Sequence, residues 1–118
     1  MLSNFNNSLE LLEVAQKELL YQKLLTQVKK DFEMANIGLE FKMDIKPDQL
    51  KGILHEKLYF LILEKFEEYL NLLYVVDISE NTIKKIEAVD AVDVSAEVCF
   101  LLLKREFQKV WFKHKYGT

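Results

Sequence analysis

The chain has 118 residues, of which half are hydrophobic and 30% are charged, and its formal net charge is −3. This balance is typical of one globular domain over residues 1–118 and excludes an intrinsically disordered chain. The mild net charge neither indicates nor excludes nucleic-acid binding. Because only three glycines and one proline interrupt the sequence, long helices are favoured.

The first helix is expected from about Ser8 to Ala35, where Leu, Glu, Lys and Gln dominate and neither Gly nor Pro occurs. Asn7 or Ser8 can cap its start. Asn36 and Gly38 tolerate the left-handed conformation that ends helices. Apolar residues recur within it at steps of three and four and predict one buried stripe: Leu9, Leu12, Leu19, Leu20, Leu24 and Val28.

Residues 37–45 alternate between apolar and polar or glycine, which is typical of a half-buried strand. We expect one extended, β-like segment here, with its odd residues facing the core: Ile37, Leu39, Phe41, Met43 and Ile45. A single strand leaves its own backbone edge unpaired, and the chain offers no second run of comparable quality. We therefore expect a second subunit or a bound chain to pair with it, unless the segment lies along its own helices.

A second helix is expected from Pro47 to about Val76, because proline suits the first turn of a helix. Residues 58–63 are apolar on every face, which predicts the most buried element of the fold. The core residues expected from this helix share that apolar pattern: Leu58, Leu61, Ile62, Phe66, Leu70 and Leu73.

Two shorter signals complete the expected fold. Asp77 and Glu80 are spaced as a capping box that opens a short helix to about Ala88. Asp90 or Asp93 then caps a last helix, which runs to about residue 115 and is ended by the glycine at 117. The expected fold class is mainly all-α, with three long helices and one short helix in a bundle beside the extended segment.

The sequence contains no catalytic, cofactor or metal motif. Cys99 lies in an apolar run, where an unreactive buried thiol is expected, and nothing in the spacing brings it to His55 or His114. The Glu-x-x-His pairs of a di-iron bundle are missing. Acidic groups at 64–68 and 90–97 are explained by a solvated face and by the helix dipole. We therefore expect neither an enzyme nor a bound cofactor.

The cellular setting is expected to be the cytoplasm. The single cysteine excludes an internal disulfide. The N-terminus lacks the basic start and apolar run of a signal peptide. The longest apolar stretch, residues 58–63, is far shorter than the roughly 20 residues of a membrane span.

Basic and aromatic residues interleave near the C-terminus. Phosphate neutralisation and base stacking by such residues would suit single-stranded nucleic acid. The same helix begins acidic and ends basic, as its dipole favours, so a structural explanation also exists. The cations are Lys104, Arg105, Lys109, Lys113 and Lys115, and the aromatic residues are Phe107, Trp111, Phe112 and Tyr116.

The stretch Leu72–Glu80, with its Tyr74 and its Asp-Ile-Ser-Glu cap, resembles a segment of small, uncharacterised bacterial helical proteins. In those proteins a tyrosine, a basic residue and a similar cap join two helices. This chain carries Val75 where the pattern has a basic residue. The resemblance covers roughly residues 56–109 and implies a similar fold but no activity.

The leading functional hypothesis is a non-enzymatic interaction module that forms a homodimer. Its candidate interface residues are Leu39, Phe41 and Met43 on the extended segment, and Phe107, Trp111 and Phe112 near the C-terminus. Burial of Trp111 inside its own domain is an equally good interpretation. The alternative function is a small nucleic-acid-binding or regulatory protein that uses the basic, aromatic C-terminal helix.

Overall fold

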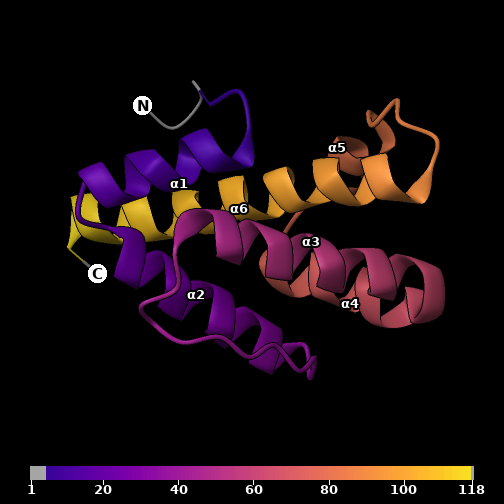
Figure 1. Cartoon of the computed structure of the whole chain (residues 1–118), viewed down its shortest axis with the longest axis horizontal. Coiled ribbons are helices and arrows are strands. Elements are labelled where there is room, and N and C mark those ends of the chain that lie inside the picture. The colour runs from indigo at the N-terminus through magenta and orange to yellow at the C-terminus, as the bar shows by residue number, and fades with distance from the viewer. Residues whose placement is uncertain (1–4, 118) are drawn as a thin grey trace.

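The computed structural model describes residues 5–117. These residues form six helices and no strand, so the mainly all-α prediction is confirmed. Figure 1 shows their arrangement, with α6 running the length of the molecule. The helices are α1 (Ser8–Lys17), α2 (Tyr21–Met34), α3 (Pro47–Glu64), α4 (Phe66–Val76), α5 (Glu80–Lys84) and α6 (Ala91–Tyr116).

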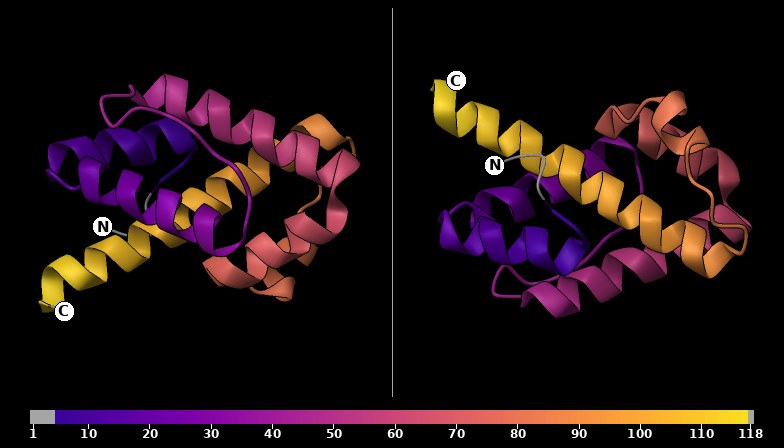
Figure 2. Two further views of the ribbon diagram at one scale, coloured as in Figure 1. Left: turned by 90° about the horizontal axis from the view of Figure 1, so that it is seen from below. Right: turned by 90° about the horizontal axis from the view of Figure 1, so that it is seen from above.

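Helix α6 is the axis of the fold and packs against α1, α2, α3 and α4. The side chain of Asp90 accepts a hydrogen bond from the Asp93 amide and caps its start, and Gly117 ends it with φ of 69°. Both ends agree with the sequence prediction. Its C-terminal turns extend past the other helices (Figure 2). The inner face of α6 carries six buried apolar side chains: Val98, Cys99, Leu102, Leu103, Phe107 and Val110.

The expected helix 8–35 is two helices, α1 and α2, separated by a turn at residues 18–20. Asn7 caps α1, as predicted, by accepting a 2.9 Å hydrogen bond from the Glu10 amide. The turn depends on Leu19, which adopts φ of 60° although it is not a glycine. Because the turn redirects the chain, the apolar residues of α1 and α2 both reach the core. The prediction of one helix was wrong here because no local breaker marks the turn.

Replacement of Leu19 by glycine is expected to raise the free energy of unfolding by up to about 1 kcal/mol, because a side chain in the left-handed region is strained. Leu19 is 87% exposed, so little buried surface is lost. Chemical denaturation would measure the change. Leu19→Ala is the control, because it removes the same side chain but retains the strained Cβ. A glycine variant less stable than the alanine variant would contradict the strain.

The expected helix 47–76 is also broken, at Lys65, whose φ of −139° and ψ of 58° are not helical. Pro47 opens α3 as predicted. Leu58, Leu61 and Leu73 are buried, but the break alters which faces of α4 point inward. Phe66 and Leu70 are therefore exposed rather than in the core, and Ile62 is half-buried. Three residues of the apolar stretch 58–63 are also exposed, namely Tyr59, Phe60 and Leu63.

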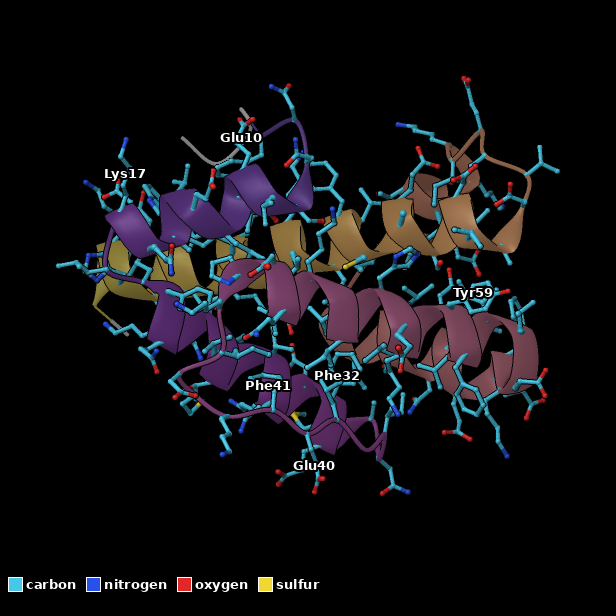
Figure 3. All side chains as sticks on the ribbon, in the orientation of Figure 1. Glu10, Lys17, Phe32, Glu40, Phe41 and Tyr59 are labelled. Atoms are coloured by element: carbon cyan, nitrogen blue, oxygen red, sulfur yellow. The ribbon has the colours of Figure 1, made fainter. Side chains whose placement is uncertain are left out.

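Residues 37–45 form an irregular connection, so the predicted β-like segment is wrong. The alternating burial is nevertheless present. Ile37 and Ile45 are buried, the three odd residues between them are half-buried against the core, and the even residues are exposed. Figure 3 shows Glu40 pointing away from the body while Phe41 lies back against α2. The alternating burial therefore arises because the segment packs on a helical surface, and not because it pairs with a strand.

Side chains of α2 supply the hydrogen bonds that a neighbouring strand would have made to this segment. Lys29 Nζ donates to the Phe41 carbonyl at 2.7 Å and Gln22 Nε2 to the Met43 carbonyl at 2.8 Å. The Tyr21 hydroxyl donates to the Ile45 carbonyl at 2.6 Å. Burial raises the pKa of Tyr21 to about 12, so this donor stays protonated. The segment therefore needs no second chain to satisfy these three carbonyl groups.

The short helix α5 is capped differently from the prediction. Ser79, rather than Asp77, accepts a hydrogen bond from the amide three residues later, that of Thr82. Asp77 instead ends α4 in the left-handed conformation, with φ of 73°. Its carboxylate binds Arg105 of α6 at 2.9 Å. The expected capping box is therefore replaced by a serine cap and a tertiary ion pair.

Candidate interaction surface

The three interface candidates of the 37–45 segment lie against their own chain. Leu39, Phe41 and Met43 are half-buried and pack on the core. The Phe41 ring also lies under the Lys29 ammonium, which is 4.7 Å from its centroid. These three side chains, and the carbonyls of Phe41 and Met43, therefore already have partners within the chain.

The three C-terminal interface candidates are divided by α6 between the core and the surface. Phe107 is 2% exposed and packs edge-to-face on Phe5 at 5.8 Å, which places it in the core rather than on a surface. Trp111 is half-buried and packs against the core. Phe112 is exposed, lies 5.4 Å from the Trp111 ring and stacks on Tyr116 at 5.9 Å. Of these three candidates, only Phe112 in the last turns of α6 is exposed.

The five C-terminal cations do not form one basic surface. Arg105 binds Asp77, and Lys109 Nζ lies 2.7 Å from Asp31 Oδ2. Lys104 lies over the Phe100 ring, 5.9 Å from its centroid. The other two, at 113 and 115, are exposed and form no ion pair within the described part of the chain. Two of the five cations are therefore paired with carboxylates of the same chain.

A buried charged cluster, which no sequence pattern predicted, joins α2 to α6. Asp31 accepts hydrogen bonds from Lys109 and, at 3.2 Å, from Gln27. Glu106 is 0% exposed, and Lys109 lies 3.3 Å from its Oε1. Burial raises the pKa of Glu106 to about 9, and the Asp31 carboxylate adds to the rise. The Glu106 carboxyl is therefore protonated at neutral pH.

The pKa of Asp31 is displaced in the opposite direction. Burial would raise it, but the neighbouring Glu106 carboxyl and the hydrogen bond and positive charge of Lys109 outweigh burial and hold it below its ordinary value. At neutral pH Asp31 is thus ionised beside a neutral Glu106, and Lys109 balances the one negative charge. The cluster joins two helices that are distant in sequence, which explains why periodicity did not reveal it.

An apolar hollow of the surface lies between α4 and α5, and Ile62 of α3 also lines it. We call it the α4–α5 groove; its volume is about 540 Å³. On α4 three large side chains border it at intervals of four residues: Phe66, Leu70 and Tyr74 are 53%, 49% and 84% exposed. Its other lining residues are Tyr69, Leu73, Ile78, Glu80, Ile83, Lys84 and Val94.

Two exposed residues of this groove, Phe66 and Leu70, were predicted from the sequence to lie in the core. A continuous helix 47–76 would keep them in phase with Leu58 and Leu73, but the break at Lys65 rotates α4 relative to that register. The sequence signal that could have indicated their exposure is the width of the apolar face on α4. Phe66, Tyr69, Leu70, Leu73 and Tyr74 span more of the helix surface than one packed neighbour covers.

The cysteine and the two histidines form no hydrogen bond with one another, and no metal-binding cluster is found, in the described part of the chain. Among residues 5–117 there is no group of three or more His, Cys, Asp or Glu side chains arranged to hold a metal ion. His55 binds the Val92 carbonyl and the Ser95 hydroxyl at the start of α6, whereas His114 lies near its end. Burial raises the pKa of Cys99 to about 12, which keeps the thiol in its unreactive protonated form.

No helix within residues 5–117 combines the length and the apolar character needed to cross a membrane. Comparison with protein-family models gives no match, and neither the curated proteins nor the solved structures contain a significant match to this chain.

Proposed function

We propose that this protein is a non-enzymatic helical interaction module that forms a homodimer through the α4–α5 groove. The observation that carries the proposal is the stripe of large apolar side chains on α4, left half or more exposed beside an apolar hollow. Contiguous exposed apolar surface of this kind is characteristic of association sites. Aromatic side chains at the centre of such a patch supply much of the binding energy.

A second copy is the occupant that the stripe fits best. If α4 crosses its copy at Leu70 about a two-fold axis, Phe66 of each chain faces Tyr74 of the other, so one stripe completes itself. Charges at the rim are also complementary. Glu67 follows Phe66 on α4, and Lys84 lines the α5 wall, and neither forms an ion pair among the described residues.

This interface differs from the one that the sequence indicated. The homodimer hypothesis began from an unpaired strand edge at residues 37–45, whereas α2 now satisfies three of that segment's carbonyls. The resemblance to small bacterial helical proteins stays a prediction. We also propose a cytoplasmic location, supported by a lone cysteine that is buried and unpaired.

Replacement of Leu70 by glutamate tests the dimer. The charge would be buried at the centre of the interface, so we expect the dissociation constant to rise by about 30-fold or more, as for a hot-spot residue. Sedimentation velocity across micromolar concentrations measures the change. Because Leu70 is half exposed in one chain, the thermal midpoint of the isolated monomer should not fall.

Val89→Glu is the matched control, because Val89 is almost fully exposed and lies outside the groove. That variant should dimerise like the unsubstituted protein. A protein that sediments as a monomer throughout the micromolar range before any substitution would overturn the proposal. A Leu70→Glu variant that dimerises as tightly as Val89→Glu would show that a different surface is used.

A further inference from the structure

We propose that the groove between α2 and the C-terminal turns of α6, here called the α2–α6 groove, binds a phosphate-bearing ligand. It has a volume of about 470 Å³ and lies away from α4 and α5 along the molecule (Figure 1). Its lining residues are Gln22, Lys23, Thr26, Gln27, Lys30, Val110, Lys113 and His114.

The charge of this groove has one sign. The groove is lined by Lys23, Lys30, Lys113 and His114 and by no carboxylate. This local excess of basic residues contrasts with the net charge of −3 on the whole chain. None of these three lysines forms an ion pair within the described residues. Like charges held together without a counter-ion repel one another, and a concave surface concentrates their field. An anion in the groove would relieve that repulsion.

The positions of the groove residues follow from the two helices. On α2 the polar residues 22, 26 and 30 recur every four residues and 23 and 27 lie beside them, so they share one face of the helix. On α6 Val110, Lys113 and His114 likewise share one face. Gln27 and Val110 are buried and form the floor, while the lysines are exposed at the rim. A rim of mobile ammonium groups above a fixed floor suits phosphate oxygens.

The buried charged cluster lies behind the floor of the α2–α6 groove and does not cancel the positive potential of the groove. Gln27 connects the two, since its Nε2 donates to Asp31. Lys109 neutralises Asp31 at 2.7 Å, and Glu106 stays protonated at neutral pH because burial raises its pKa. These two carboxylates therefore contribute no net negative charge beneath the groove.

Phosphate groups could come from a free oligophosphate or from a nucleic-acid strand, and two probes separate these sources. Binding of a single-stranded RNA oligonucleotide is measured by fluorescence anisotropy across a salt series, and tripolyphosphate binding is measured by calorimetry. If tripolyphosphate binds directly and displaces RNA, the ligand is a free oligophosphate. If RNA binds and tripolyphosphate does not, the ligand is a strand. Absence of binding to both probes at low salt overturns the proposal.

Substitution of the three groove lysines assigns the site. For the RNA arm, Lys23→Gln, Lys30→Gln and Lys113→Gln should each lower the slope of log affinity against log salt by about one. Each should also weaken tripolyphosphate binding if that arm is positive. Lys85→Gln is the control, since Lys85 is exposed, directly follows α5 and lies outside the groove. An equal loss in the control would mean diffuse attraction and would refute the site.

The dimer proposal and the phosphate proposal fail independently. Leu70→Glu lies outside the α2–α6 groove and should bind the phosphate probes as the unsubstituted protein does. Conversely, the three lysine variants should leave the sedimentation behaviour unchanged. Loss of phosphate binding in the Leu70→Glu variant would show that the groove is not a site of the single chain, contrary to the proposal.

Discussion

Replacement of Lys109 by methionine is expected to lower the free energy of unfolding by roughly 3–5 kcal/mol, because it leaves a buried carboxylate without its cation. Asp31 is 3% exposed and would keep only the Gln27 amide as a hydrogen-bond partner. Methionine retains the packing of the lysine stem, so the loss reports on charge. Against a total stability of roughly 5–15 kcal/mol for a small domain, the change is large. Urea denaturation at neutral pH measures it.

Lys113→Met is the matched control for this prediction. Lys113 lies one turn further along the same helix, and its side chain is exposed and forms no ion pair among the described residues. Adding Asp31→Asn to Lys109→Met should recover part of the loss, because the unpaired charge disappears. If Lys109→Met and Lys113→Met unfold at the same urea concentration, the buried ion pair contributes nothing measurable.

Replacement of Glu106 by glutamine is expected to remove a fall in stability that the unsubstituted protein shows as the pH rises. The carboxyl has a pKa of 4.5 when unperturbed and about 9 in the fold. Between these two values the folded protein holds a proton that the unfolded chain has released. Stability therefore decreases with rising pH through that range. Glutamine is neutral at every pH and can still donate to Asp31.

At pH 7 the Glu106→Gln variant should be more stable than the unsubstituted protein by up to about 3 kcal/mol. This figure follows because each pH unit above the unperturbed pKa of 4.5 costs the unsubstituted protein about 1.4 kcal/mol. Thermal unfolding at intervals from pH 5 to about 8 would record the slope. Asp31 has the opposite effect on the pH dependence. Because its pKa is lowered in the fold, the stability that it contributes is lost only as the pH falls into the acidic range.

Glu97→Gln is the control for Glu106→Gln, since Glu97 is an exposed glutamate on the same helix. Its variant should keep the pH dependence of the unsubstituted protein. A Glu106→Gln variant that is less stable than the unsubstituted protein at pH 7, with an unchanged pH slope, would mean that Glu106 is ionised in the fold.

Local chemistry predicted the helix starts and stops that depend on one or two residues. Asn7 and Asp90 cap helices through hydrogen bonds to nearby amides. Pro47 opens α3 and Gly117 closes α6. These signals act within a single turn of helix, so the sequence contains all of the information they need.

The breaks at Leu19 and Lys65 were not predictable in the same way, because neither residue is a local breaker. Leu19 holds φ of 60° at a cost that the packing of α1 and α2 on α6 repays. At Lys65 the chain turns so that both α3 and α4 contact α6. Gains of this kind arise from residues distant in sequence and override local helix propensity.

The sequence by itself determined the mainly helical class, the N-terminal caps of α1 and α6 and the alternating burial of residues 37–45. Only the tertiary structure decided what lies against that segment, because a period of two records which side chains are buried and not whether a strand or a helix buries them. The tertiary structure also decided which apolar and charged side chains stay free. Phe66 and Leu70 reach the surface because the chain changes direction at Lys65, between α3 and α4. Lys109 is not free because it forms an ion pair with Asp31 of α2.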